Sequence, residues 1–124
     1  MMSQLGIVLT GAPFDSERWK TAYEMARAAL DTGHEVSIFA YLDGAHVPMV
    51  DQRFDEAAEN GLYQRMPVDR YEELLEDGAE MFVCGLCADA RSIDPQSDFP
   101  DEVTVGLLPD LADVIGEADR VISL

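Results

Sequence analysis

Residues 5–41 read LGIVLTGAPFDSERWKTAYEMARAALDTGHEVSIFAY, and this stretch decides the fold. It begins with an apolar run, Leu5–Thr10, that has the length and composition of a buried parallel strand. A helix follows, because apolar side chains recur at helical spacing along one face: Trp19, Ala22, Tyr23, Ala26, Ala29 and Leu30. Gly33 is a natural residue at which to end this helix, and Glu35–Tyr41 then forms a second strand. The stretch is therefore a strand–helix–strand unit with parallel strands.

Strands and helices go on alternating through the rest of the chain. Further strands are expected at Glu80–Cys84, Val103–Gly106 and Arg120–Leu124. Further helices are expected in four places: a short one around Arg53–Glu59, one that begins at Pro67 and buries Tyr71, Leu74 and Leu75, one over Cys87–Ser92, and one whose apolar face is Leu108, Leu111, Ala112 and Ile115. We therefore predict a single α/β domain over residues 1–124, with a mostly parallel five-stranded sheet between helices on both faces, in three layers.

Three loops are expected to meet at one edge of this sheet. They are Thr10–Phe14, Leu42–Asp51 and the turn from Cys84 to Cys87. Each leaves the carboxyl end of a parallel strand, and the sites of open α/β sheets lie at that edge. A further loop, Ile93–Glu102, is expected on the surface. We therefore look for chemistry at the carboxyl edge.

The chain is strongly acidic, with 25 Asp and Glu against 8 Lys and Arg and a formal net charge of −17. Such a surface repels phosphate backbones and anionic lipid, which argues against nucleic acid and membranes as partners. Because concentrated salt would screen the self-repulsion, we expect a protein from a salt-loving organism; the alternative is an acidic domain that docks onto a basic partner. No apolar stretch reaches the ~20 residues that span a bilayer, and the first residues do not resemble a signal peptide, so a cytoplasmic location is expected.

Both cysteines lie in residues 81–93, MFVCGLCADARSI. Cys84 ends an apolar strand and Cys87 lies near the start of a helix, where N–H groups favour a thiolate. Three chemistries fit such a pair: dithiol redox exchange, a metal site, and sulfur transfer as a persulfide. A metal would need two more ligands, and His34, one of only two histidines, is expected at the opposite edge of the sheet. The offset of Cys84 from the helix start argues against a thioredoxin-like centre, and a plain buried thiol is the remaining alternative.

The same segment resembles the DsrE/DsrF-like family of sulfur-relay proteins. The family pattern is an apolar strand, Cys-Gly-x-Cys, and then Ala-Arg-Gly before an apolar residue. This chain has Cys84-Gly85-Leu86-Cys87 followed by Ala90-Arg91-Ser92-Ile93, with serine where the pattern has glycine. The likeness extends along the chain, through residues 11–18 (GAPFDSER), 33–36 (GHEV), 43–44 (DG) and 118–122 (ADRVI).

The resemblance implies a flavodoxin-like topology and assembly into homotrimers or hexamers. Because the ligands for a metal are lacking, no metal or cofactor is expected. The resemblance also implies that Cys84 carries sulfane sulfur as a persulfide between a donor protein and an acceptor protein, because the family's sulfur-carrying cysteine lies seven residues before the arginine that is Arg91 here. Cys87 is either a resolving thiol that attacks a Cys84 persulfide or a passive residue. The alternative function is a small-ligand-binding or assembly module of the same fold that transfers no sulfur.

Several other side chains are candidates for the surroundings of the cysteines. Arg91 is expected to pair with Asp89, Asp94 or a neighbouring subunit rather than with the thiolate. His46 is expected on the surface, or as a proton donor if its loop folds inward. Tyr41 and Phe14 either line a pocket or pack at the strand ends.

Overall fold

The computed structural model describes residues 3–52 and 66–124, and the expected short helix around Arg53–Glu59 lies outside them. Five strands form one sheet in which every pair is parallel. They are β1 (Gln4–Leu9), β2 (Glu35–Ala40), β3 (Glu80–Cys84), β4 (Thr104–Gly106) and β5 (Arg120–Ser123). The strand order is β4-β3-β2-β1-β5. The predicted five-stranded α/β sheet is confirmed, and it is wholly rather than mostly parallel.

The order of the strands differs from the flavodoxin order that the resemblance implied. In flavodoxin the first strand lies between the second and the third. Here β1 lies between β2 and β5, because the chain adds β2, β3 and β4 on one side and then returns across the sheet. The flavodoxin-like topology is therefore correct for the layers and wrong for the strand order.

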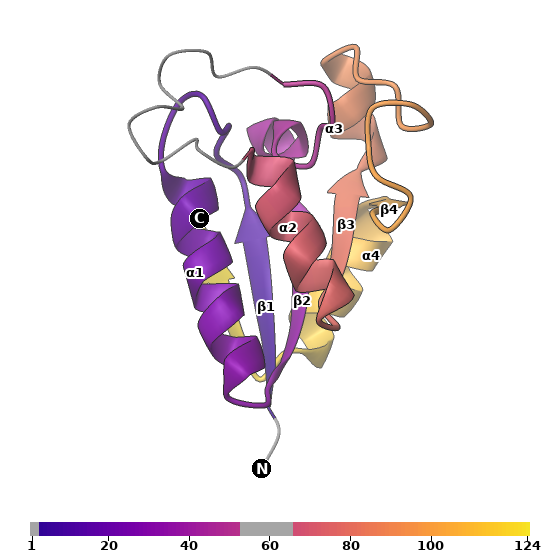
Figure 1. Cartoon of the computed structure of the whole chain (residues 1–124). Helices are drawn as coiled ribbons and strands as arrows, with labels where there is room; N and C mark the ends of the chain where they lie inside the picture. The colour runs from indigo at the N-terminus through magenta and orange to yellow at the C-terminus, as the bar shows by residue number, and fades with distance from the viewer. Residues whose placement is uncertain (1–2, 53–65) are drawn as a thin grey trace.

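The helices lie on both faces of the sheet, as predicted (Figure 1). On one face α1 (Arg18–Asp31) packs beside α2 (Pro67–Glu76), while α4 (Leu108–Glu117) lies on the other. The connection from β2 to β3 thus covers one face and the connection from β4 to β5 covers the opposite one. The chain changes face around β3 and β4, and in open α/β sheets ligand sites lie at the carboxyl ends of the strands where this change occurs.

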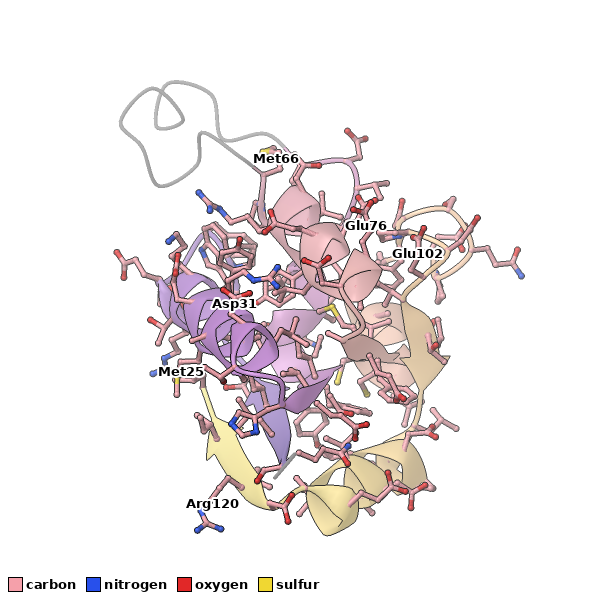
Figure 2. The ribbon with its side chains drawn as sticks, turned by 60° about the horizontal axis from the view of Figure 1, so that its bottom comes forward. Met25, Asp31, Met66, Glu76, Glu102 and Arg120 are labelled. Carbon is pink, nitrogen blue, oxygen red and sulfur yellow. The ribbon has the colours of Figure 1, made fainter. Side chains whose placement is uncertain are left out.

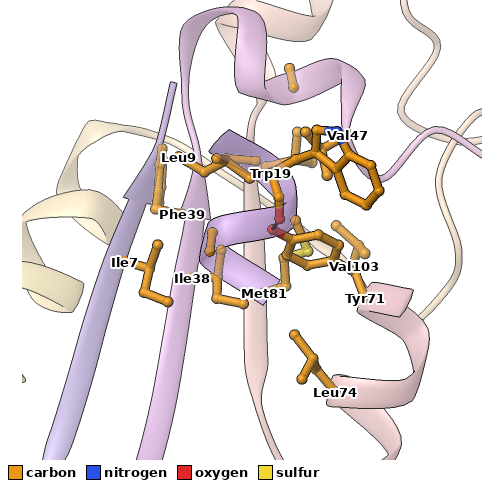
Figure 3. Close-up of a cluster of buried hydrophobic side chains, with 14 of the residues drawn as sticks. Ile7, Leu9, Trp19, Ile38, Phe39, Val47, Tyr71, Leu74, Met81 and Val103 are labelled. Atoms are coloured by element: carbon orange, nitrogen blue, oxygen red, sulfur yellow. Dashed lines mark hydrogen bonds between the residues drawn. The ribbon is translucent and has the colours of Figure 1, made fainter. Parts of the chain in front are cut away.

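The main core lies between the sheet and the pair α1 and α2 (Figure 3). Trp19 from α1 and Tyr71 from α2 are fully buried, and the Tyr71 hydroxyl donates a 2.7 Å hydrogen bond to the Trp19 carbonyl. On the opposite face of the sheet, which α4 covers, Phe39 of β2 stacks on Phe82 of β3 with ring centroids 6.3 Å apart. Pro67 occupies the first turn of α2, where its missing N–H costs no helical hydrogen bond. The large apolar residues picked out by the sequence pattern thus fix two helices to the sheet.

The helix α4 does not bury the face that its sequence suggested. Val114 is buried, whereas Leu108 and Ile115 are 51% and 46% exposed. Two neighbouring apolar stripes run along this helix, and the one with Val114 faces the sheet, where its carbonyl lies close to Gly6. The expected face of Leu108, Leu111, Ala112 and Ile115 is therefore wrong except for Leu111, which packs partly against the core. Among the described residues no helix combines the length and the apolar character needed to cross a membrane.

Acidic side chains gather on the outer face of α2. Asp69, Glu72 and Glu76 lie there together, and Glu102 approaches from the loop before β4; Figure 2 shows Glu76 and Glu102 on this side of the molecule. Partial burial, with the negative charges of Glu102, Asp69 and Glu76, raises the pKa of Glu72. The excess of acidic residues in the sequence thus leads, on this face of α2, to repulsion between neighbouring carboxylates.

Candidate functional site

Cys84 stands at the junction of β3 and α3 (Gly85–Ala90). The helix begins two residues earlier than the expected Cys87–Ser92, because Cys84 itself caps it: its backbone is extended and its sulfur accepts a 3.4 Å hydrogen bond from the Cys87 N–H. Cys84 ends β3, as predicted, but the helix begins directly after it, so the predicted offset between Cys84 and the helix start is wrong. With Cys84 as the cap and Cys87 in the first turn, the arrangement also suits exchange between two thiols.

The site lies where the loops after three strands converge. Cys84 pairs with Gly106 at the end of β4, and the short 3-10 helix η1 (Leu42–His46), which follows β2, packs against α3. A cavity of about 250 Å³ opens here, and most of its lining is apolar. It is lined by Tyr41, Leu42, Cys84, Leu86, Cys87, Ala90, Arg91 and Leu108. The carboxyl edge of the sheet thus holds both cysteines, as predicted, but Leu108 after β4 lines the cavity and no residue of the expected Thr10–Phe14 loop does.

A larger hollow, of about 510 Å³, lies at the opposite edge of the sheet. His34 and Arg120 line it, and the His34 Nδ1 accepts a 3.2 Å hydrogen bond from the Ser3 N–H. The predicted separation of His34 from the cysteines is therefore confirmed. Because this hollow contains no thiol, the smaller cavity around the cysteines is the candidate functional site.

Neither thiol is in a disulfide, and both are buried: Cys84 is 2% exposed and Cys87 is 7% exposed. The Cys87 sulfur accepts a 3.1 Å hydrogen bond from the N–H of Leu42. Leu42 has φ 53°, a left-handed conformation that is unfavourable for leucine. Strain of this kind persists where the surrounding structure enforces it, often at functional sites. In this chain it aims a backbone donor at a sulfur atom.

The surroundings of Cys87 oppose the loss of its proton. Burial raises the pKa of Cys87 most, and the neighbouring Cys84 thiol raises it further. The Leu42 N–H and the positive charge of Arg91 act in the opposite direction without cancelling the rise. Cys87 therefore keeps its proton at neutral pH and can donate it toward the Cys84 sulfur. The place of Cys84 at the cap of α3, where the Cys87 N–H points at its sulfur, favours Cys84 as the nucleophile.

Arg91 pairs with Asp43, not with Asp89 or Asp94 as expected. Its Nη2 and Nε lie 2.8 and 2.9 Å from one Asp43 carboxylate oxygen, and its Nη1 donates to the Cys87 carbonyl at 3.1 Å. The guanidinium folds back along α3, and η1 lies beside that helix. Sequence reasoning missed Asp43 as a site residue, although its position just after a strand end is a signal for such a role.

The aromatic candidates and His46 take different places. Tyr41 lines the cavity, which was one of the two places expected for this side chain. Phe14 does not line it and instead contacts the ring of His46 edge-on, with centroids 5.2 Å apart. Burial, and then the charge of Arg91, lower the pKa of His46, so this histidine is neutral at pH 7. His46 thus lies beside the site, within the field of Arg91, and does not reach the cavity.

The end of α3 explains why the family pattern has glycine where this chain has Ser92. Ile93 N–H bonds to the Ala88 carbonyl at 2.9 Å and Ser92 N–H to the Asp89 carbonyl at 3.1 Å, which is a Schellman motif. Ser92 occupies its left-handed position, with φ 57°. The same position is held by Gly33 after α1 and by Gly78 after α2, as was predicted for Gly33. Glycine adopts this conformation without the steric penalty that a Cβ brings.

Ser92→Gly is therefore expected to stabilise the protein by about 1 kcal/mol, or roughly 3–5 °C in melting temperature. Gly78→Ser is the matched control, because a Cβ there meets nothing within 4 Å and only the backbone conformation opposes it. It should destabilise by a similar amount. Urea unfolding of both variants checks the pair, and a Ser92→Gly variant no more stable than the wild type would contradict the assignment.

The sequence of this chain matches a family model and two curated relatives. The family model of the DsrE/DsrF-like family matches residues 3–124. An uncharacterized protein of Methanopyrus kandleri is 34% identical over 116 residues, covering 94% of this chain and 89% of the relative. Another of Methanocaldococcus jannaschii is 31% identical over 121 residues, covering 94% of this chain and 96% of the relative.

Two solved structures share the fold. The ychN protein from E. coli has a TM-score of 0.75 at 22% identity, over 99% of this chain and all of the other. A protein of unknown function from Methanobacterium thermoautotrophicum has a TM-score of 0.72 at 15% identity, over the whole of both chains. With the family model matched along almost the entire sequence and relatives above 30% identity, the chain belongs to the DsrE/DsrF-like family.

Proposed function

We propose that the protein relays sulfur, carrying it as a persulfide on Cys84 between a donor protein and an acceptor protein. The observation that carries the proposal is the place of Cys84, which caps α3 at the carboxyl edge of the sheet, in a cavity shared with a second thiol. Membership of the DsrE/DsrF-like family supports the same function.

The chemistry needs one nucleophilic sulfur and no net oxidation. The Cys84 thiolate attacks the outer sulfur of a donor persulfide; a bond forms between the Cys84 sulfur and that sulfur, and the donor's S–S bond breaks. The donor leaves as a thiolate. In the second step an acceptor thiolate attacks the outer sulfur on Cys84, which then leaves as a thiolate in turn. The Cys87 N–H at the Cys84 sulfur stabilises the negative charge each time it returns there.

The cavity suits a persulfide on Cys84. Its apolar lining excludes water from the sulfur, and a water-poor site protects a reactive intermediate from side reactions. Cys84 itself is 2% exposed, while Leu42 and Leu108 at the cavity are 45% and 51% exposed. A partner's cysteine therefore has to displace one of these side chains to reach the sulfur. The expected homotrimer or hexamer stays a prediction.

Loading of sulfur onto single-cysteine variants tests the proposal. The protein is incubated with inorganic polysulfide, and its intact mass is recorded without reductant. Cys87→Ser is expected to gain the mass of sulfur and keep it, wild type is expected to gain it first and then to end as the Cys84–Cys87 disulfide, and Cys84→Ser is expected to gain none. Cys84→Ser is a matched control for the fold, because serine keeps a hydrogen-bond acceptor at the cap of α3. Loading of Cys84→Ser to the wild-type level would overturn the assignment to Cys84.

The deep burial of both thiols favours one second candidate, a small-ligand-binding or assembly module in which they are structural. The two functions differ in thiol reactivity. A module of this kind would leave Cys84 unmodified by iodoacetamide at neutral pH in the folded protein. A sulfur carrier would be alkylated there, and the label would be lost in Cys84→Ser.

A further inference from the structure

An ion pair joins two elements of the site. Arg91, at the end of α3, contacts Asp43 on η1 through Nη2 at 2.8 Å and Nε at 2.9 Å, and its Nη1 reaches the Cys87 carbonyl at 3.1 Å. We call Arg91 and Asp43 the clasp. An exposed ion pair contributes little stability by itself. Here the Arg91 side chain is 25% exposed and that of Asp43 is 59% exposed, and Arg91 makes two contacts to Asp43 and one to the Cys87 carbonyl, so the clasp links one element to the other.

What the clasp fixes is the residue before Asp43. Leu42 is held in a left-handed conformation, and its N–H points at the Cys87 sulfur from 3.1 Å. A leucine released from its surroundings would leave this conformation, because it costs about 1–2 kcal/mol. Asp43 follows directly and is tied to α3, the helix that carries Cys87. The ion pair and the strained N–H donor thus lie on adjacent residues and end on the same helix.

We propose that Arg91 is a positioning residue that acts through Asp43: it keeps the Leu42 N–H on the Cys87 sulfur and so sets how readily Cys87 becomes a thiolate in the closed site. The proposal deepens the sulfur-relay function, and its purpose rests on that function. A Cys87 thiolate is the species that can attack a persulfide on Cys84, so the clasp would govern how long sulfur stays on the carrier.

The groups that face Cys87 either oppose or favour the ionisation of its thiol. Cys84 and burial oppose ionisation of Cys87, whereas the Leu42 N–H and the charge of Arg91 favour it. The other titratable groups around the site are Tyr41, which lines the cavity, and Asp43 and His46 on η1. His46 carries no charge at neutral pH because its pKa is lowered. The two influences that promote a thiolate at Cys87 therefore both depend on the clasp.

Alkylation of each cysteine as a function of pH tests the proposal without any sulfur donor. Initial rates with iodoacetamide are measured on the full chain from about pH 7 to about pH 10, which spans the ordinary cysteine pKa. Fragment ions of the peptide that contains both residues separate Cys84 from Cys87. In Arg91→Gln the Cys87 profile is expected to move to higher pH, with a rate about three- to tenfold lower near pH 8, while the Cys84 rate does not increase.

Three further variants make the result specific. Arg91→Lys keeps the charge but loses the forked contact, so an intermediate shift is expected. Asp43→Asn weakens the clasp from its other end while keeping an acceptor oxygen, and a smaller shift of the same sign is expected. Arg120→Gln removes an arginine at the opposite edge of the sheet and should leave both profiles unchanged.

Two outcomes would overturn the proposal. Faster alkylation of both cysteines in Arg91→Gln would mean that the arginine only keeps the site closed. An unchanged Cys87 profile in both Arg91→Gln and Asp43→Asn would mean that the clasp does not act on Cys87. Either outcome is separate from failure of the sulfur-relay function, which would instead appear as Cys87→Ser protein that takes up no sulfur from polysulfide.

Discussion

Gly44→Ala is expected to destabilise the protein by about 3 kcal/mol or more, a large part of the stability of an ordinary domain. A Cβ at this position would lie 1.9 Å from the carbonyl oxygen of Leu9, far inside van der Waals contact. The obstacle is backbone, so no side-chain rotation relieves it. That carbonyl also accepts a 2.8 Å hydrogen bond from the Tyr41 N–H. The start of η1 therefore has to move away from β1, and this hydrogen bond is disturbed as well.

The Gly44→Ala substitution is expected to disturb the site as well as the fold. Displacing η1 removes the Leu42 N–H from Cys87 and separates Asp43 from Arg91. Urea unfolding is expected to give a much lower midpoint, and iodoacetamide to modify both cysteines faster than in the wild type. Gly116→Ala is the matched control: it lies in α4, nothing is within 4 Å of its added Cβ, and about 0.5–1 kcal/mol of stabilisation is expected. Equal midpoints for the two alanine variants would contradict the close approach.

Cys87→Ser is expected to abolish release of sulfide from sulfur-loaded protein. In the wild type, the Cys87 thiolate attacks the Cys84 sulfur of the persulfide, a Cys84–Cys87 bond forms, and the outer sulfur leaves as hydrosulfide. The electrons balance, because the sulfane sulfur is reduced to sulfide as the two thiols become a disulfide. Serine accepts the Leu42 N–H as cysteine does, so the site is preserved while the resolving thiol is lost.

The measurement follows sulfide and protein mass after excess polysulfide has been removed. Wild-type protein should release sulfide and end as a species that is two hydrogen atoms lighter than its reduced form. Cys87→Ser should keep its extra sulfur until an acceptor thiol is added. Release from Cys87→Ser at the wild-type rate would show that Cys87 is passive, which was the other possibility for this residue.

Much of the fold could be predicted from local patterns. The strand runs, the helix of Trp19, the helix end at Gly33 and the helix start at Pro67 all lie where the sequence put them. Each is decided by residues close together in the chain: apolar spacing, a glycine that tolerates positive φ, a proline that suits a first turn. The orientation of α4 was wrong because Val114 and Ile115 lie on two equally apolar stripes, and only contact with the sheet selects one.

The sequence by itself determined that this is an α/β protein with Cys84 at the carboxyl edge of its sheet. An apolar strand followed by a helix start depends on residues that are close together in the chain, so both can be recognised from the local pattern. Only the tertiary structure decided the strand order, the hydrogen bond from Leu42 to Cys87, and the pairing of Asp43 with Arg91. These partners are 45 and 48 residues apart. They meet because β2 lies beside β3, and that adjacency follows from how the whole sheet packs rather than from either local pattern.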